Sequence, residues 1–180
     1  TSFYFISKML GMKMEDFEFP KRYGGNIRIY LNINKKIKKK KLSFFLKKEK
    51  NFLLDLKNLK LRFNIWKKNK YLELKKIYNS YGKIEAKGFP GRAAVILNLI
   101  DIQKYISCVY EKNNSPKVGH FVPGTRIPII KDKILFDKKI KPKYILNLAW
   151  HIKKEIKNYL KENLVNSKMI NIVDIKDFKI

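Results

Sequence analysis

Apolar residues along the chain follow two different spacings, and the spacing changes near residue 82. Between residues 41 and 81, leucine and aromatic residues recur every three or four positions with lysines on the opposite side, a pattern typical of amphipathic helices. The residues of this apolar stripe are Leu42, Phe45, Leu46, Phe52, Leu53, Leu56, Leu59, Phe63 and Trp66. A break near Lys50 predicts two helices, and Gly82 predicts the end of the second. We expect the stripe to pack against a sheet, although such a stripe can also line a ligand groove.

Beyond residue 82, short apolar runs alternate with helical segments. Strands are expected over 84–88, 105–111, 127–130 and 143–148, and helices over 93–100, 133–136 and 152–163. This alternation with short connections predicts an α/β fold in which helices cover both faces of a parallel sheet. The predicted fold class is a Rossmann-like domain preceded by a long helical segment.

The first 40 residues have a different character. They predict a helix over 2–11 followed by strands over 14–19 and 26–33. A helix and two strands cannot bury their apolar faces alone. We therefore expect three parts: residues 1–40 as the remainder of another domain, 41–82 as a helical connector, and 83–180 as the Rossmann-like domain.

The connection after the first strand of that domain carries the clearest turn signal of the sequence, Gly88-Phe-Pro-Gly-Arg92. A helix that begins after Gly91 would direct free N–H groups and its positive end at an anion, with the guanidinium of Arg92 beside them. Glu111 follows Gly91 by 20 residues, the offset at which nucleotide-binding βαβ units place an acid near a ribose hydroxyl. The sequence contains no G-x-G, so Gly88 and Gly91 can equally serve only to form a tight turn.

Several loops are expected to meet where the parallel strands end, which is where such sheets bind ligands. They contain Phe89 to Arg92, Glu111 to Ser115, Pro123 to Arg126, and Trp150 with His151. Each also has a plainer interpretation. His151 can bind a phosphate or cap the helix that follows it, Trp150 can stack on a ligand or pack in the core, and Pro123-Gly124-Thr125 can form a wall of the site or a rigid turn.

These motifs occur in an order that resembles a known enzyme family. The segments Gly88-Phe-Pro-Gly-Arg-Ala-Ala-Val-Ile-Leu-Asn98, Glu111, Ser115-Pro-Lys-Val-Gly119, Pro123-Gly-Thr-Arg-Ile-Pro128 and Leu148-Ala-Trp-His151 are similar to the C-terminal part of S-adenosylmethionine-dependent sugar C-methyltransferases. Tyr23-Gly-Gly-Asn-Ile-Arg28 resembles the element that closes the family's methyltransferase domain. The resemblance extends from about residue 2 to about residue 160.

The resemblance implies methylation of a carbon atom of a nucleotide-linked deoxysugar. In the family, the methyl donor binds to a Gly-rich loop, zinc is held by an N-terminal cysteine module, and the proposed base is a histidine. None of these motifs is found in this sequence. The histidine would precede the stretch that matches Ser2-Phe-Tyr-Phe5, so we expect the catalytic base to lie upstream of Thr1. We therefore interpret the chain as the C-terminal part of a longer enzyme, inactive on its own, in which the S-adenosylmethionine site also lies outside residues 1–180.

The resemblance and the strand ends together give the predicted site. The residues expected to contact a nucleoside-diphosphate sugar are Gly88, Phe89, Pro90, Gly91, Arg92, Glu111, Ser115, Pro123, Gly124, Thr125, Trp150 and His151, with Gly24, Gly25, Asn26 and Arg28 in support. No metal site is predicted, because the chain has two histidines, one cysteine and few acids.

A net charge of +27 ordinarily indicates nucleic acid or an anionic membrane as a partner. Of the 42 basic residues only five are arginine, however, and the 37 lysines are spread along the chain. Bidentate reading of bases favours arginine, so we expect no sequence-specific nucleic acid binding and interpret the dense run 35–41 as a solvated loop. No membrane span is expected, and the lone Cys108 fits a reducing cytoplasm.

Two other functions remain open from the sequence. A nicotinamide-dependent oxidoreductase fragment would explain the βαβ unit and Glu111, but the absence of G-x-G weakens it. A basic nucleic-acid-binding module would explain the charge but not the loops at the strand ends.

Overall fold

The computed structural model describes residues 2–20, 26–34, 43, 46–47 and 49–178. The chain forms two compact units, residues 1–61 and 62–180. The boundary between them falls inside one long helix, α3 (Phe52–Tyr81). The predicted division at residues 40 and 82 concerns the domains of an intact enzyme and stays a prediction.

The first unit contains helix α1 (Ser2–Met9) and an antiparallel hairpin of β1 (Lys13–Glu18) and β2 (Arg28–Asn32), as the sequence predicts. Its buried apolar residues are few: Met14 and Phe17 are buried, and Tyr4, Ile29 and Leu31 pack against them. Large apolar side chains of this unit remain exposed, among them Phe3, Phe5, Ile6, Met9, Leu10 and Phe19. The described part of this unit therefore has the unburied apolar faces that the sequence predicts.

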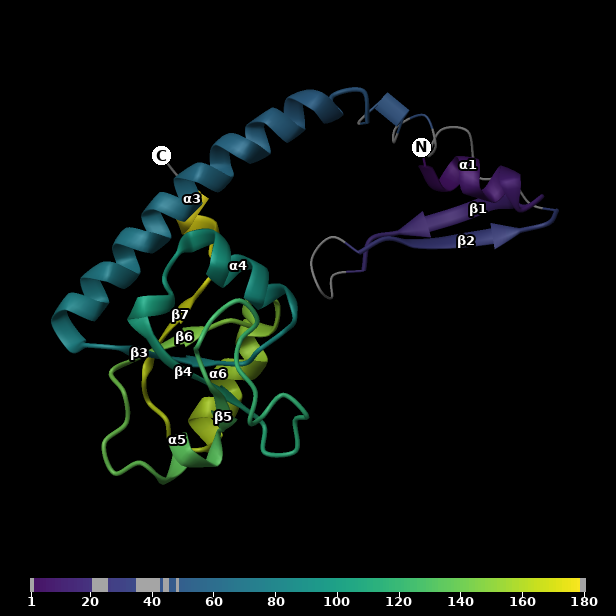
Figure 1. Cartoon of the computed structure of the whole chain (residues 1–180). Helices are drawn as coiled ribbons and strands as arrows, with labels where there is room; N and C mark the ends of the chain where they lie inside the picture. The colour runs from purple at the N-terminus through teal and green to yellow at the C-terminus, as the bar shows by residue number, and fades with distance from the viewer. Residues whose placement is uncertain (1, 21–25, 35–42, 44–45, 48, 179–180) are drawn as a thin grey trace. The chain divides into compact units, whose positions relative to one another are not determined.

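The second unit is built on a five-stranded sheet in which every neighbouring pair is parallel (Figure 1). Its strands are β3 (Ile84–Lys87), β4 (Ile106–Glu111), β5 (Ile129–Lys131), β6 (Tyr144–Asn147) and β7 (Lys168–Asn171). Their order across the sheet is β5-β4-β3-β6-β7. The predicted α/β fold and the first four strands are confirmed, whereas β7 is a strand that the sequence analysis did not predict.

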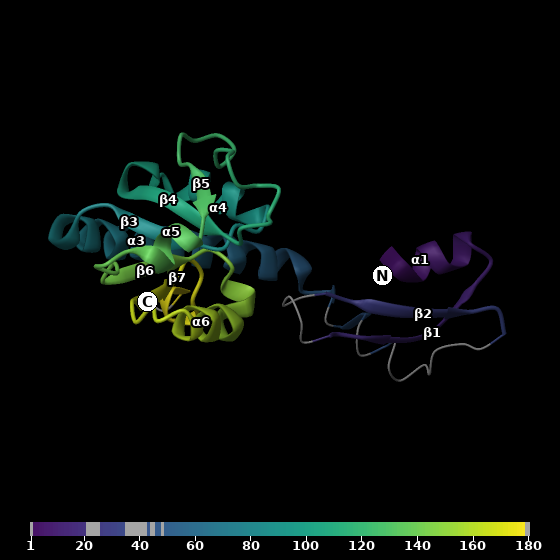
Figure 2. The ribbon, with the colours of Figure 1, turned by 90° about the horizontal axis from the view of Figure 1, so that it is seen from below.

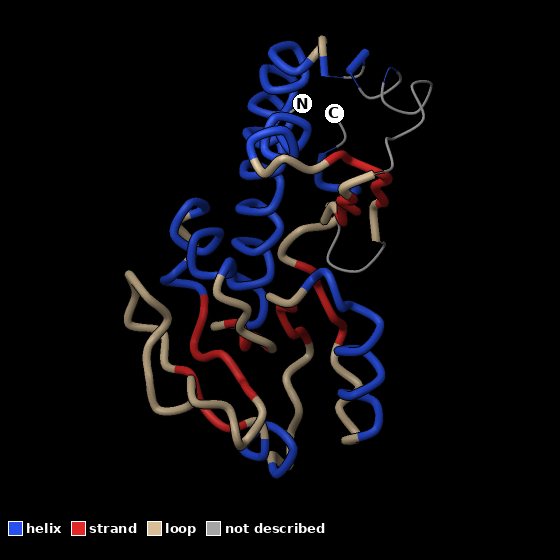
Figure 3. Tube along the Cα trace, turned by 90° about the vertical axis from the view of Figure 1, so that its right-hand side faces the viewer, coloured by secondary structure: helices blue, strands red, loops and turns tan. Residues whose placement is uncertain are grey.

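Helices cover both faces of this sheet (Figure 2). On one face, α3 and α4 (Arg92–Ile100) supply Trp66, Leu74 and Leu97 to the larger core cluster. On the other face, α5 (Lys133–Asp137) and α6 (Lys153–Glu162) supply Leu135 and Leu160 to a second cluster. Short 3₁₀ helices cover Gln103–Tyr105, Trp150–Ile152 and Ile175–Phe178. The longest connection in this unit is the loop over residues 112–128 between β4 and β5 (Figure 3).

The apolar stripe of the long helix only partly meets its prediction. Trp66 is 2% exposed and Phe63 packs against the core, as expected. Phe52, Leu53, Leu56 and Leu59 are 49–72% exposed, and Leu46 is also exposed, so the prediction that they pack against a sheet is wrong. Leu42 and Phe45 lie outside the described residues, as does the lysine run 35–41. The residues of α3 that pack in the core of the second unit begin at Phe63, and those up to Leu61 belong to the first unit.

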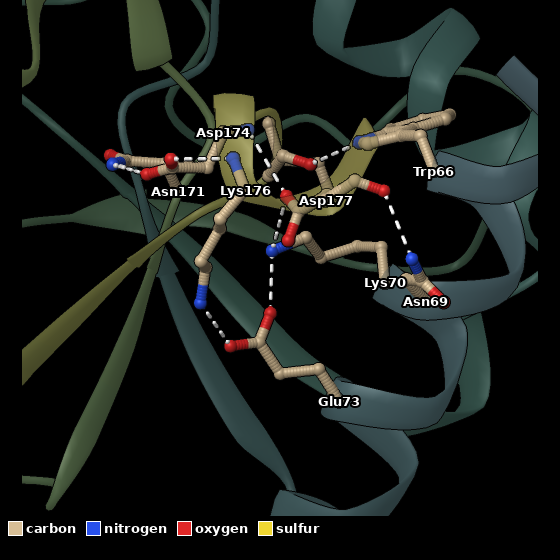
Figure 4. A network of polar contacts seen from close by, with 9 residues as sticks. Trp66, Asn69, Lys70, Glu73, Asn171, Asp174, Lys176 and Asp177 are labelled. Atoms are coloured by element: carbon tan, nitrogen blue, oxygen red, sulfur yellow. Dashed lines mark hydrogen bonds and ion pairs between the residues drawn. The ribbon is translucent and has the colours of Figure 1, made fainter. Parts of the chain in front are cut away.

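A polar network attaches the end of the chain to α3 (Figure 4). The Trp66 indole donates to the carbonyl of Ile172 at 3.0 Å, and Asn69 donates to the carbonyl of Asp177. The ammonium of Lys70, whose side chain is fully buried, lies 2.5 Å from Glu73 and 3.0 Å from Asp177. These hydrogen bonds and ion pairs join α3 to a segment that lies about a hundred residues later in the chain.

Candidate functional site at the switch point of the sheet

The strand order reverses direction between β3 and β6. From β3 the chain builds outward through β4 and β5 on one side, and then returns to add β6 and β7 on the other. Such a reversal leaves a crevice beyond the carboxyl ends of the two central strands, and α/β proteins bind ligands there. In this chain the crevice lies between Gly88, which follows β3, and Ala149, which follows β6.

A pocket of about 710 Å³ occupies this edge of the sheet. Its volume is in the range of small-molecule sites. Of the residues predicted to bind substrate, Gly88, Phe89, Pro90, Glu111, Ser115 and His151 line it. It is also lined by Lys87, Lys112, Asn114, Lys117, Ala149, Ile152, Glu155, Ile156, Asn158, Tyr159 and Glu162. Half of the predicted residues therefore lie together in one pocket.

Gly88 is required by the shape of the turn after β3. Its φ is +77°, a left-handed conformation that side chains with a Cβ rarely adopt. A Cβ at this position would also lie 3.0 Å from the Cβ of Ala149. The glycine thus lets the β3 and β6 loops approach each other at the pocket.

Glu111 does more at this turn than the sequence predicted. Its Oε1 accepts the backbone N–H of Phe89 at 3.0 Å, and this contact joins the ends of β3 and β4. The amides of Ala93 and Ala94 are accepted by the carbonyls of Pro90 and Gly91. The N–H groups of Phe89, Ala93 and Ala94 are therefore already used within the turn. A carboxylate has further lone pairs, so Glu111 can still accept a hydroxyl group from a ligand.

Lys117 completes the rim of the turn from the β4–β5 loop. Its ammonium donates to the carbonyl of Phe89 at 2.6 Å and lies 5.8 Å from the centre of the Phe89 ring. The first part of the loop over residues 112–128 is thereby attached to the turn beside the pocket, where it places a positive charge.

A buried ion pair lies beside the pocket, which its lysine lines. Lys87 and Asp132 are 2% and 1% exposed, and the ammonium lies 2.9 Å from the carboxylate. The Tyr159 hydroxyl donates to the same carboxylate oxygen at 2.8 Å. Burial, and then this hydrogen bond, raises the pKa of Tyr159 to about 12, so the hydroxyl stays protonated at neutral pH.

Lys87, Asp132 and Tyr159 were missed by the sequence analysis. The ammonium groups of Lys87 and Lys112 lie 5.0 Å and 5.5 Å from the centre of the Tyr159 ring, which places two positive charges around one aromatic side chain. Lys87 directly precedes the turn glycine, and this adjacency was the one signal in the sequence that could have identified it.

Arg92, Trp150 and His151 lie together at the start of α4 and after β6. The guanidinium carbon of Arg92 is 5.6 Å from the centre of the Trp150 ring, and Arg92 is exposed. Burial, and then the charge of Arg92, lowers the pKa of His151 below 6.5. The imidazole is therefore neutral at pH 7 and can accept a hydrogen bond as well as donate one. Gly91, Arg92 and Trp150 do not line the pocket and stand next to residues that do.

The expectation that Pro123, Gly124 and Thr125 share this edge is wrong. They precede β5, and because β5 is parallel to its neighbour β4, they lie at the amino edge of the sheet instead. There the side chain of Asn98, near the end of α4, donates to the carbonyl of Pro123 at 3.0 Å.

The pocket is connected to the polar network on α3. The fully buried Asn147 accepts the N–H of Ala149 at 2.9 Å through its side-chain oxygen and donates to Asn171 at 2.9 Å. Asn171 in turn donates to Asp174. The N–H of Asp174 donates to Asp177, so hydrogen bonds link the loop that carries Trp150 and His151 to the network on α3.

The predicted supporting residues belong to the first unit. Arg28 forms an ion pair with Glu18 at 2.6 Å across the hairpin, and Asn26 is exposed. Gly24 and Gly25 lie outside the described residues. A role of these residues at the substrate site stays a prediction.

The catalytic base is predicted to lie upstream of Thr1. Thr1 itself lies outside the described residues, and the described chain begins with Ser2 at the start of α1. His151 lines the pocket, but the resemblance assigns it to substrate binding and not to proton abstraction. The position of the base upstream of Thr1 therefore stays a prediction.

The residues that the structure describes contain no group of three or more histidine, cysteine, aspartate or glutamate side chains able to hold a metal ion. Within the same part of the chain, none of the helices combines the length and the apolar character needed to cross a bilayer.

These features define a Rossmann-like α/β domain with a ligand-sized pocket at its switch point. The model of one protein family, described as the C-methyltransferase C-terminal domain, matches residues 21–173 of the chain. The chain belongs to this family. No curated protein matches the chain significantly.

Proposed function

We propose that this chain is the substrate-binding part of an S-adenosylmethionine-dependent C-methyltransferase that acts on a nucleotide-linked deoxysugar. The observation that carries the proposal is the pocket of about 710 Å³ at the switch point, lined by Gly88, Phe89 and Glu111. Family membership supplies the reaction class, and the pocket supplies a site for its substrate.

The charges around the pocket suit a diphosphate linked to a polyhydroxyl group. Lys112 and Lys117 line the pocket, and the N-termini of α4 and α6 point to the same edge of the sheet. Cationic side chains and helix N-termini both stabilise phosphate groups. Glu111, Glu155 and Glu162 line the pocket as well, and carboxylates are suitable acceptors for sugar hydroxyls.

The described residues do not fit the methyl donor in the same way. At the turn after β3, Pro90 lacks an N–H, and the Phe89 amide is already accepted by Glu111. S-adenosylmethionine supplies the methyl group in this family's chemistry, and we place its site in another part of the intact enzyme. In this proposal the residues of the chain bind and orient the sugar nucleotide.

The first prediction concerns the methyl donor, whose site we place in another part of the intact enzyme. Calorimetric titration of this chain with S-adenosylmethionine should show no measurable binding, because the sequence contains no G-x-G loop of the kind expected to hold this donor. Micromolar affinity for the donor would contradict the assignment of its site to another part of the enzyme.

A second prediction tests the substrate site. Arg92→Ala and Lys112→Ala should each weaken binding of a nucleoside-diphosphate sugar by about tenfold or more, because each removes a charge available to the diphosphate. Lys76→Ala, on the exposed side of α3, is the matched control and should change little. Dissociation constants measured by calorimetry provide the comparison.

Glu111→Gln separates the ligand role of that residue from its structural one. The glutamine carbonyl can still accept the Phe89 N–H, so the turn should persist while the ranking of different sugars or nucleosides changes.

If neither Arg92→Ala nor Lys112→Ala affects affinity, the pocket does not hold the diphosphate. If a nicotinamide dinucleotide binds more tightly than any sugar nucleotide, the oxidoreductase alternative is favoured.

A further inference from the structure

A second hollow lies at the opposite edge of the same sheet, where the strands begin. Its volume is about 680 Å³, and it is lined by Lys83, Gln103, Lys104, Ile106, Ser107, Gly124, Thr125, Arg126 and Ile127. Lys83 directly precedes β3, whereas Gly88 follows it at the switch-point pocket, so the two hollows are separated by the length of the strands. We call this second hollow the amino-edge basin.

The charge of the amino-edge basin differs from that of the switch-point pocket. Its described lining includes three cations, Lys83, Lys104 and Arg126, and no aspartate or glutamate. The switch-point pocket is lined by three lysines and three glutamates. A concave surface with charge of one sign concentrates ions of the opposite sign. The general excess of lysine in this chain does not explain the difference, because it applies equally to both hollows.

The wall of the basin is a rigid turn. The N–H of Thr125 donates to the carbonyl of Val122 at 3.0 Å, with Pro123 and Gly124 between them and Gly124 at a φ of +77°. This is the sequence and conformation of a type II turn. The hydroxyl of Thr125 accepts the N–H of Ile127 at 3.1 Å, which fixes the backbone on both sides of Arg126.

The turn is also fastened to the rest of the domain. Asn98 donates to the Pro123 carbonyl at 3.0 Å, and Gln103 donates to the Asn98 side-chain oxygen at 3.1 Å. A Cβ on Gly124 would lie 2.8 Å from that same oxygen, so a larger residue would force the Asn98 side chain to move and would be strained at this φ. The wall that carries Arg126 is therefore held in place before any ligand arrives, which lowers the cost of binding.

We propose that the amino-edge basin binds the phosphate of a small phosphorylated molecule. The basin brings together cations from three segments of the chain: the entry to β3, the 3₁₀ helix Gln103–Tyr105, and the loop before β5. Its neutral side chains, Gln103, Ser107 and Thr125, carry hydrogen-bonding groups. Arginine binds phosphate oxygens through two parallel N–H groups, and Arg126 is the residue whose backbone the turn fixes most closely.

The test uses the chain of 180 residues with sodium pyrophosphate as the probe, followed by ¹H–¹⁵N NMR at an ionic strength of about 0.15 M. We expect saturable shifts of the amides of Ser107, Gly124, Thr125 and Arg126. The triple variant Lys83→Gln, Lys104→Gln, Arg126→Gln should weaken binding at these amides by about tenfold or more. The matched control, Lys67→Gln, Lys68→Gln, Lys76→Gln, removes the same charge from the exposed side of α3 and should leave the affinity within about twofold.

Three outcomes would overturn the proposal. Equal weakening in both triple variants would show general attraction to a basic protein. Shifts confined to other lysine-rich segments would place the anion elsewhere. A short DNA duplex that competes at these amides more effectively than pyrophosphate or a nucleoside monophosphate would show that the basin contacts a polymer. Binding at the switch-point pocket has no bearing on the result, because Gly88 and Phe89 report that site separately.

Discussion

Asp132→Ala is expected to lower the free energy of unfolding by about 3–5 kcal/mol, because it leaves the buried ammonium of Lys87 without its carboxylate. The two side chains are 2% and 1% exposed, and their charged atoms are 2.9 Å apart. The Tyr159 hydroxyl would lose its acceptor at the same time. Domains of this size are stable by about 5–15 kcal/mol, so the variant should be close to unfolding at room temperature. Urea denaturation followed by circular dichroism measures the difference.

The double variant Lys87→Met, Asp132→Leu is the control for this experiment. Replacing a buried ion pair with apolar residues of similar volume is often neutral or stabilising, so the double variant should recover much of the stability that Asp132→Ala loses. The double variant should nevertheless bind a sugar nucleotide poorly, because it removes Lys87, which lines the pocket. A double variant as unstable as the single one would show that packing, and not an unpaired charge, accounts for the loss.

Lys70→Ala should have an effect nearly as large, about 3 kcal/mol, because removing the lysine leaves a buried carboxylate without its cation. The ammonium is fully buried between Glu73 and Asp177, and the side chain of Asp177 is only 6% exposed. Lys75→Ala, an exposed position on the same helix, is the matched control and should be nearly neutral, since alanine is itself a good helix former.

The pH dependence of this variant provides an independent check. Burial raises the pKa of Glu73, but hydrogen bonds and charges from Lys70 and Lys176 outweigh it and lower the pKa below 4.5. The hydrogen bond from Asn171 lowers the pKa of Asp174 below 3.8. Depressed carboxyl pKa values give stability that is complete above the unfolded-state values and is lost as the pH falls through the folded-state values.

The stability difference between the wild type and Lys70→Ala should therefore be larger at about pH 7 than at about pH 3, where the wild type has itself lost part of this contribution. Chemical denaturation at the two pH values measures it. An equal difference at both would mean that Lys70 contributes through its methylene groups alone.

The sequence predicted the features that local chemistry determines. The turn around Gly88 and Pro90 and the strand that ends at Glu111 were predictable, because turn residues and the spacing of apolar residues act over a few positions. The position of Pro123 was misjudged although the strand order contained the answer: a loop that precedes a parallel strand lies at the opposite edge from one that follows it.

Other features depend on residues far apart in the chain. Lys87 and Asp132 are 45 positions apart, and only the sheet brings them together. The strand β7 becomes a strand by pairing with β6, a contact that the local sequence does not reveal. For the long helix, periodicity identified which residues share a face but not what covers it, so the exposure of Phe52 and Leu53 could not be foreseen.

The contact between Trp66 and the end of the chain also bears on how the protein is made. Trp66 and Ile172, which accepts its indole N–H, are 106 residues apart. At translation rates of about 5–20 residues per second, the ribosome needs about 5–20 s to synthesise the intervening chain. During that interval Trp66 is without the segment that covers it, and Lys70 lacks Asp177. The nascent chain thus exposes an aromatic, basic helix until residues 172–177 have been synthesised, and this is the period in which a molecular chaperone would have most effect on its yield.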